Sequence, residues 1–472
     1  MPDVALLIDF GSTYTKLRAI DLDRREIVGS GQGPSTVASD INVGLQAALS
    51  DLEQRMGALP RFRHRLASSS AAGGLRMVTV GLVRELTAQA AREAALGAGA
   101  KVVGAFAYRL TASDMAGILD LAPDILLLAG GTDGGNSEVV LHNSQVIGTS
   151  ALSCPIVYAG NRSAADEARV RLRDKSVIVT DNVMPEFNVL GIEPARSAIR
   201  RVFIDRIVHA KGIDRAQTEL DAVLMPTPAA VMEGAKLLAD GVGSTVGLGT
   251  VLVVDPGGAT TDVHSIASGE PATSGTIPQG LPEPRAKRTV EGDLGMRHNA
   301  ATIVESAGME AISREARLAP ERVSALLADF ARDVGALPQT ADERALDQAL
   351  ARAAVRYAVK RHCGSIETVY TPTGPVTVQH GKDLTRVACI IGTGGAVVSS
   401  ADPRAVLTNA LADPADPTSL RPRNPRLLLD RHYLLYACGL LSAVDPEAAC
   451  ELALNHLETL APESPHECAR RA

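Results

Sequence analysis

The chain has 472 residues, of which 46% are hydrophobic and only 3% aromatic, with no Trp and a formal net charge of −7. This length allows two domains with sizeable cores, while the few aromatic residues and the negative charge argue against base stacking and against a broad basic face for nucleic acid or anionic lipid. The sequence contains neither a signal-peptide pattern nor a membrane-length apolar stretch. We therefore expect a cytoplasmic protein, with no membrane or nucleic-acid partner, that acts on a small molecule or another protein.

Short apolar runs alternate with amphipathic stretches in the first part of the chain. Strands are predicted at 4–8, 101–106, 125–128, 156–158 and 177–180, and helices at 43–56 and 164–172. Such alternation is typical of an α/β fold with a largely parallel sheet. We assign residues 1–190 to a first lobe.

The rest of the chain repeats this alternation with more helix. Residues 193–240 look helical throughout, with Pro194 in a first turn, so residues 191–249 are predicted to be a helical connection. A second lobe is predicted at 250–405, with strands at 251–254 and 387–391 and a helical insertion at about 294–362. Helices are expected at 432–442 and 446–457 in a C-terminal region of residues 406–472.

The two halves share sequence patterns at similar separations. LLIDFGSTYTK at 6–16 matches LVVDPGGATTD at 252–262, because each is an apolar strand that ends in Asp and runs into glycine and hydroxyl residues. We also pair LLLAGGTDGG at 126–135 with CIIGTGGAVV at 389–398. These pairs predict a gene duplication within one fold.

The first Asp–Gly–hydroxyl segment has the groups that a phosphate with Mg²⁺ requires: a carboxylate, backbone N–H groups and side-chain donors. Asp9 would hold Mg²⁺ through water, and Gly11 would form the tight turn. The phosphates would be bound by hydroxyl donors and one point charge, namely Ser12, Thr13, Thr15 and Lys16.

In the second segment, Asp255 would face Asp9 across a cleft, with Asp262 nearby. The terminal phosphates would be cradled by Gly257, Gly258, Thr260 and Thr261. Alternatively, each glycine-rich turn only joins two strands and its Asp is a turn former. Two copies at matching places favour the phosphate-binding interpretation. A Walker-type P-loop is excluded because GxxxxGK[ST] does not occur.

These segments resemble the motifs of a known superfamily. DFGSTYTK (9–16) resembles the first phosphate loop of actin, sugar kinases and heat-shock chaperones, DPGGATTD (255–262) resembles the second phosphate loop of the chaperones, and IIGTGG (390–395) resembles the adenosine motif. The resemblance implies an α/β fold of two duplicated actin-like (ribonuclease H-like) lobes that flank a nucleotide cleft, with helical insertions, and ATP and Mg²⁺ as ligands.

The same resemblance assigns roles to individual residues. Asp9 and Asp255 become metal-orienting carboxylates, and Thr260 becomes a γ-phosphate contact. The nucleoside would lie against glycines of the adenosine motif, namely Gly392, Gly394 and Gly395.

Nearly the whole chain also resembles the glutamate mutase L-type (GlmL/MutL) proteins, which are unrelated to the mismatch-repair protein called MutL. The motifs that carry this resemblance are SSAAGGLRM (69–77), LAGGTDGGN (128–136), IEPARSAIR (192–200), MPTPAAV (225–231), VEGDLGMR (290–297), YTPTG (370–374) and GKDLT (381–385). The resemblance implies an ATP-dependent reactivating chaperone for an adenosylcobalamin-dependent aminomutase of the glutamate mutase or ornithine aminomutase type.

The function expected from the sequence is therefore that of a slow ATPase. Asp9, Asp255 and Asp262 would be its catalytic carboxylates, and Asp255 or Asp262 would orient the attacking water. A small-metabolite kinase on the same fold and a nucleotide-binding scaffold are the alternatives. The identity of the mutase, the oligomeric state and the role of residues 291–297 are left open.

Overall fold

A computed structural model describes residues 3–11, 14–36, 40–70, 75–210, 221–335, 337–372 and 374–461, without the side chains of 206–210 and 223. The chain forms two compact units. Unit 1 comprises Met1–Leu237, Gln279–Lys287 and Leu435–Leu452, and unit 2 comprises Leu238–Pro278, Arg288–Leu434 and Ala453–Ala472. Among the described residues, no helix is both long and apolar enough to span a bilayer.

The first sheet of unit 1 has five strands in the spatial order β10 (Ala222–Pro226), β4 (Phe62–Ser69), β1 (Val4–Phe10), β2 (Tyr14–Asp21), β3 (Glu26–Pro34). The hairpins β1–β2 and β2–β3 are antiparallel, whereas β1, β4 and β10 run parallel. Helix α1 (Ile41–Met56) packs closely on β3, because a Cβ at Gly31 would lie only 2.4 Å from the carbonyl oxygen of Ala48.

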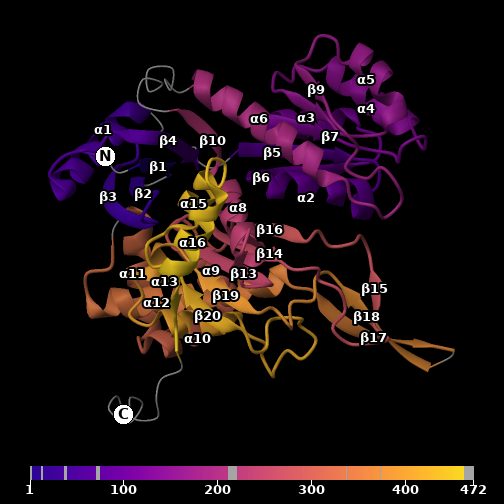
Figure 1. The fold of residues 1–472 in the computed structure, drawn as a ribbon. Coiled ribbons are helices and arrows are strands. Elements are labelled where there is room, and N and C mark those ends of the chain that lie inside the picture. The colour runs from indigo at the N-terminus through magenta and orange to yellow at the C-terminus, as the bar shows by residue number, and fades with distance from the viewer. Residues whose placement is uncertain are drawn as a thin grey trace. The chain divides into compact units, whose positions relative to one another are not determined.

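A second sheet of unit 1 is inserted between β4 and β10. Its strands are all parallel, in the order β6 (Ala100–Ala107), β5 (Leu75–Gly81), β7 (Ile125–Leu128), β8 (Ile156–Tyr158), β9 (Val177–Val179). One face is covered by α3 (Ala112–Asp120), α4 (Glu138–Gly148) and α5 (Ala165–Arg171). The other is covered by α2 (Gln89–Gly97) and α6 (Ile192–Ala210), as Figure 1 shows. This is a doubly wound arrangement.

Helices complete unit 1 around these sheets. The short η1 and η2 and three longer helices remain: η1 (Arg84–Ala88), η2 (Arg162–Ala164), α8 (Thr227–Asp240), α15 (Leu435–Leu441) and α16 (Pro446–His456). Helices α8 and α15 approach closely, since a Cβ at Gly234 would lie 2.3 Å from the carbonyl oxygen of Leu435. Helix α15, near the C-terminal end of the chain, therefore packs on α8.

Unit 2 has a six-stranded main sheet in the order β16 (Ala286–Glu291), β14 (Thr261–Ile266), β13 (Val251–Pro256), β19 (Cys389–Gly392), β20 (Arg426–Leu429), β21 (Glu458–Thr459). Strands β13 and β14 form an antiparallel hairpin, and β13, β19 and β20 run parallel. A smaller sheet has the order β15 (Ile277–Gln279), β18 (Gly374–His380), β17 (Ser365–Thr371). The short strands β11 (Gly241–Val242) and β12 (Thr245–Val246) pair with each other.

Unit 2 carries a helical insertion between β16 and β17. It consists of α9 (Ala300–Ala307), α10 (Met309–Ala316), α11 (Pro320–Arg332) and α12 (Ala341–His362), which share a core with the main sheet. Helix α12 begins with a capping box in which Thr340 and Glu343 satisfy each other's backbone N–H groups. Shorter helices follow β19, namely α13 (Gly395–Val398), α14 (Pro403–Leu407) and η3 (Thr408–Ala410).

The main sheets of the two units have the same topology. In each, an antiparallel hairpin with a third strand beside it is followed by two strands that extend the sheet from the first strand, which gives the order 3-2-1-4-5 in β3-β2-β1-β4-β10 and in β16-β14-β13-β19-β20. This is the ribonuclease H-like arrangement, and its repetition confirms the predicted α/β fold and its duplication.

Two predictions about the elements are wrong. The counterpart of β19 is β4, not β7, because β4 holds the fourth position of its sheet whereas β7 belongs to the doubly wound insertion. A buried parallel strand that runs into glycines has the same sequence pattern in either sheet. Residues 193–240 are also not helical throughout, since β10 interrupts them and completes the first sheet.

Candidate functional site

The first predicted phosphate loop is a tight hairpin turn in unit 1. Asp9 pairs with Lys16 in the β1–β2 register, and Gly11 donates its backbone N–H to the carbonyl oxygen of Tyr14 at 3.1 Å. A Cβ at Gly11 would lie 2.6 Å from that oxygen, so the turn requires glycine here. Ser12 and Thr13, both predicted phosphate donors, lie outside the described residues.

Asp9 lies at the carboxyl ends of three parallel strands. It is the last but one residue of β1 and pairs with Ser68 of β4, and Thr227 follows directly after β10 as the first residue of α8. The hydroxyl of Thr227 donates to Asp9 Oδ1 at 2.6 Å, and that of Ser68 donates to the same oxygen at 3.3 Å. Ligands of open α/β sheets bind at this end of the strands. The arrangement fixes the direction of the Asp9 carboxyl group.

The Asp9 carboxyl group is almost fully buried, with 2% of the residue exposed. Burial raises its pKa above the usual value. The positive charge of Lys16 and the hydroxyl groups of Thr227 and Ser68 offset part of that rise. A bound cation would act in the same direction as Lys16.

Thr15 lies on the other face of the hairpin. It pairs with Phe10, and its Oγ1 is 3.2 Å from the position of a Cβ at Gly44 in α1. Asp9 and Lys16 share the opposite face because side chains alternate along a strand. The structure therefore does not bring Thr15 to the Asp9 side, and its buried hydroxyl has no hydrogen-bond partner among the described residues.

The second predicted phosphate loop in unit 2 repeats the geometry of the first. Asp255 pairs with Asp262 in the β13–β14 register, and Gly257 donates its backbone N–H to the carbonyl oxygen of Thr260 at 2.8 Å. A Cβ at Gly258 would meet no atom closer than 4.0 Å, so the top of this loop is open. Asp255 thus occupies the position of Asp9, and Asp262 that of Lys16.

The segment 291–297 forms hydrogen bonds with the second loop. The backbone N–H groups of Met296 and Arg297 donate to the carbonyl oxygens of Gly257 and Gly258, each at 2.9 Å. The hydroxyl of Thr261 donates to the carbonyl oxygen of Leu294 at 2.7 Å, so this predicted phosphate ligand is engaged in anchoring the loop. The conformation of the loop therefore depends on this motif, whose role the sequence leaves open.

Asp262 is held by two side chains. Arg288 donates through Nε to Asp262 Oδ1 at 2.8 Å, and Thr260 donates through Oγ1 to Oδ2 at 3.0 Å. Arg288 itself is only 4% exposed. The orientation of Asp262 is thus fixed by a buried ion pair next to the loop.

The predicted adenosine motif of unit 2 adjoins Asp255. Gly394 has a φ of 80°, and a Cβ on it would lie 2.0 Å from Asp255 Oδ1. Gly395 starts α13 with open space around it, whereas a Cβ at Gly392 would meet Leu407 and Val397 of the core. Of the three predicted nucleoside contacts, Gly394 lies beside the carboxylate, Gly395 opens to solvent and Gly392 packs inside.

Unit 2 also repeats the three-strand arrangement around Asp9. Thr393 follows β19 and donates its hydroxyl to Oδ2 of Asp430, which follows β20, at 3.0 Å. Both residues are buried. Asp255, Thr393 and Asp430 thus correspond by strand position to Asp9, Ser68 and Thr227. Reasoning from the sequence missed Ser68 and Thr227 in unit 1 and Thr393 and Asp430 in unit 2. A signal for Asp430 exists, because RLLLD at 426–430 is again an apolar strand that ends in Asp.

These residues suit Mg²⁺ that is bound together with a nucleotide better than they suit a metal ion held by protein side chains alone. Among the described residues, no group of three or more His, Cys, Asp or Glu side chains could hold a metal ion. Mg²⁺ is commonly bound by one or two carboxylates together with the phosphates of the nucleotide. Asp9 and Asp255 would supply such carboxylates, each beside a glycine turn.

Comparison with known proteins places the chain in a family. The family model described as MutL protein matches residues 5–457. Protein MutL of Clostridium tetanomorphum is 45% identical over 459 residues, which cover 96% of this chain and 99% of that protein.

Two solved structures are similar at low identity. Nucleotide-free acetone carboxylase has 15% identity and a TM-score of 0.42, with 94% of this chain and 70% of that chain covered. The activator of 2-hydroxyisocaproyl-CoA dehydratase from Clostridium difficile, with bound ADPNP, has 10% identity and a TM-score of 0.30, with 97% and 100% covered. TM-scores this low carry no argument about function.

Proposed function

The chain belongs to the MutL protein family, and on that premise we propose that it binds ATP with Mg²⁺ through its two equivalent hairpin loops and hydrolyses ATP slowly. One observation carries this proposal. Asp9 and Asp255 are each the last but one residue of equivalent strands, and in each hairpin the glycine two residues later closes the same turn. A carboxylate fixed beside a glycine turn, twice in one chain, is the arrangement that a metal-bound triphosphate requires.

Each residue of the proposed site has a distinct task. Asp9 and Asp255 would orient water or a cation, and Lys16 would place a positive charge on the phosphates. Asp262, fixed by Arg288 and Thr260, would accept a hydrogen bond from the attacking water. Mg²⁺, when bound, would neutralise the charge of the phosphates. The nucleoside would lie against Gly394 and Gly395.

The family supports a further part of the proposal. We propose that the energy of ATP hydrolysis is used to reactivate an adenosylcobalamin-dependent aminomutase, of the glutamate mutase or ornithine aminomutase type. A nucleotide-driven conformational change would alter the affinity for the mutase and let damaged cofactor leave. Mg²⁺ as the metal and the cytoplasm as the location belong to the same proposal.

The test is ATP hydrolysis by the purified full chain, alone and with glutamate mutase or ornithine aminomutase that has been inactivated by turnover. We expect ATP-dependent recovery of one mutase. Hydrolysis without recovery of either would refute the chaperone role and leave the nucleotide site standing. Phosphate transfer to a metabolite instead of water would identify a kinase, and absence of nucleotide binding would leave a scaffold.

The site itself is tested by Asp255→Asn, which removes one charge and keeps the shape. We expect hydrolysis to fall by about a hundredfold or more, as is usual when a metal anchor is lost. The matched control is Asp329→Asn on α11, which affects only an exposed pair with Arg332 and should leave turnover unchanged. Wild-type turnover in Asp255→Asn would refute the assigned role.

A further inference from the structure

Unit 2 contains a cavity of about 530 Å³ that includes none of the residues of the proposed nucleotide site. Its walls come from β17, β18 and the segments 272–276, 383–388 and 420–424. This volume lies in the range of small-molecule sites. The GKDLT motif at 381–385, to which the proposed function gives no role, forms part of the wall.

The cavity lies at the opposite end of the sheet from the second phosphate loop. Val387 and Ala388 line the cavity just before β19 begins, whereas Thr393 and Gly394 follow its end. The four residues of β19 correspond to roughly 13 Å. A ligand here would therefore occupy a site separate from the phosphate loop of unit 2.

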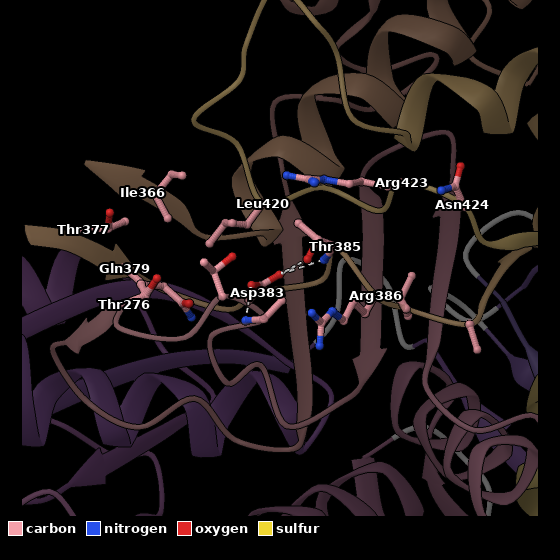
Figure 2. Close-up of a pocket in the computed structure, with 14 residues that line it drawn as sticks. Thr276, Ile366, Thr377, Gln379, Asp383, Thr385, Arg386, Leu420, Arg423 and Asn424 are labelled. Atoms are coloured by element: carbon pink, nitrogen blue, oxygen red, sulfur yellow. Dashed lines mark hydrogen bonds between the residues drawn. The ribbon is translucent and has the colours of Figure 1, made fainter. Parts of the chain in front are cut away.

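The motif holds the cavity in shape. Asp383 Oδ1 accepts the backbone N–H of Thr385 at 2.9 Å and its hydroxyl at 2.6 Å, and Oδ2 accepts the backbone N–H of Ala272 at 2.9 Å (Figure 2). Since both carboxylate oxygens are engaged, Asp383 joins two wall segments and its charge is partly compensated within the wall.

The cavity has a positively charged side. Arg386 and Arg423 line it, both are exposed, and neither side chain forms an ion pair with any residue that the structure describes. In Figure 2 both guanidinium groups extend toward the middle of the view, where Asp383 and Leu420 lie. Guanidinium groups recognise carboxylate and phosphate through paired hydrogen bonds.

The other side of the cavity holds a buried acceptor without a partner. Gln379, only 2% exposed, donates through Nε2 to the carbonyl oxygens of Gly269 at 2.8 Å and Gly381 at 2.9 Å. These two acceptors fix which end of the amide is nitrogen. Its Oε1 accepts no hydrogen bond from any residue that the structure describes, and burial of an unsatisfied acceptor is costly. A ligand hydroxyl or amine would satisfy it.

We propose that this cavity binds a small organic anion that carries a carboxylate or phosphate group and a hydroxyl or amino donor. The anionic group lies against Arg386 and Arg423, and the donor bonds to Gln379 Oε1. Ile366 and Leu420 contact the carbon skeleton of the ligand. The ligand is an effector or substrate separate from the nucleotide.

The experiment is isothermal titration calorimetry of the full chain, without nucleotide, against L-malate, succinate, glycerol 3-phosphate and inorganic phosphate. We expect saturable binding of L-malate or glycerol 3-phosphate, and whichever binds identifies the anionic group. Succinate and inorganic phosphate test the requirement for a hydrogen-bond donor. Succinate lacks the hydroxyl of malate, and inorganic phosphate lacks the glycerol skeleton of glycerol 3-phosphate and its hydroxyls. Succinate should therefore bind about tenfold more weakly than L-malate, and inorganic phosphate about tenfold more weakly than glycerol 3-phosphate.

Variants locate the binding. Arg386→Ala and Arg423→Ala should each weaken it about tenfold, and the control Arg344→Ala, on the exposed face of α12, should not change it. The proposal is overturned if neither L-malate nor glycerol 3-phosphate binds saturably, if both cavity variants bind as the wild type does, or if each simpler anion binds as tightly as its partner. Because no nucleotide is present, the result does not depend on the proposed ATPase.

Discussion

Gly394 lies so close to Asp255 that a Cβ on residue 394 would be 2.0 Å from the carboxylate oxygen Oδ1. The φ of 80° at this position is also one that side chains disfavour. This glycine therefore fixes the space into which the Asp255 carboxylate extends, and it links two segments that are far apart in the sequence.

Gly394→Ala should consequently both strain the backbone and displace Asp255. We expect the free energy of unfolding in urea to fall by about 2 kcal/mol or more, together with a loss of ATP binding. Gly395→Ala is the control, because it starts α13 with open space around it and should change stability by less than about 0.5 kcal/mol. Equal stabilities of the two variants would contradict the steric argument.

Thr227→Val should remove the 2.6 Å hydrogen bond that directs the Asp9 carboxyl group while keeping the shape of the side chain. A hydrogen bond to a buried charged group contributes about 1.5–3 kcal/mol, so ATP affinity should fall by roughly tenfold or more. Thr227→Ser keeps the hydroxyl and should retain affinity. If Ser and Val variants bind ATP equally, Thr227 only packs against the sheet.

The sequence predicted those parts of the site that lie within one short segment. Asp9 with Gly11 and Asp255 with Gly257 are neighbours along the chain, so the pattern alone indicates a carboxylate next to a turn. Ser68 and Thr227 are brought to Asp9 only by the pairing of β1, β4 and β10. No local pattern encodes which strands become neighbours in a sheet.

The wrong pairing of residues 126–135 with 389–398 has the same origin. Strands β7 and β19 are both short, buried and followed by glycine, as parallel strands covered on both faces commonly are. Only the order of strands in the sheet separates them. Strand β10 was missed because AVLMP continues directly into α8, so its apolar residues also fit a helix.

Arg297, in the segment whose backbone contacts the second predicted phosphate loop, provides a test of the 291–297 motif. Arg297 forms a largely buried ion pair with Asp347 at 2.5 Å, and its guanidinium carbon lies 4.6 Å from the centre of the Phe330 ring. Burial raises the pKa of Asp347, and the charge of Arg297 lowers it. Removal of the arginine would leave this carboxylate buried without its cation.

Arg297→Met should therefore lower the free energy of unfolding by about 2 kcal/mol, somewhat less than for a fully buried pair. The double variant Arg297→Met/Asp347→Leu should recover most of that loss, because no unpaired charge remains. Additive losses in a double-mutant cycle, measured by urea unfolding, would show that the ion pair does not couple the two residues.

His264 lies two residues after Asp262 on β14 and is 1% exposed, and in the part of the chain that the structure describes its Nδ1 has no hydrogen-bond partner. Burial, and secondly the positive charge of Arg288, lower its pKa to about 3. An unfolded histidine titrates near pH 6.5. Between these two values the unfolded chain binds a proton that the folded chain does not bind, so this residue makes the fold less stable as the pH falls from about 6.5 toward 3.

His264→Leu should remove this contribution. The stability of the variant relative to the wild type should rise as the pH falls, by at most about 1.4 kcal/mol per pH unit below 6.5. Urea unfolding at several pH values between 7 and 4 measures the difference, in which the contributions of other titrating groups cancel to first order. His380→Leu, at an exposed position on β18, controls for the loss of an imidazole. Parallel stability curves for wild type and His264→Leu would mean that His264 accepts a proton in the folded state as readily as in the unfolded state. The description of His264 as a buried neutral imidazole beside Arg288 would then be wrong.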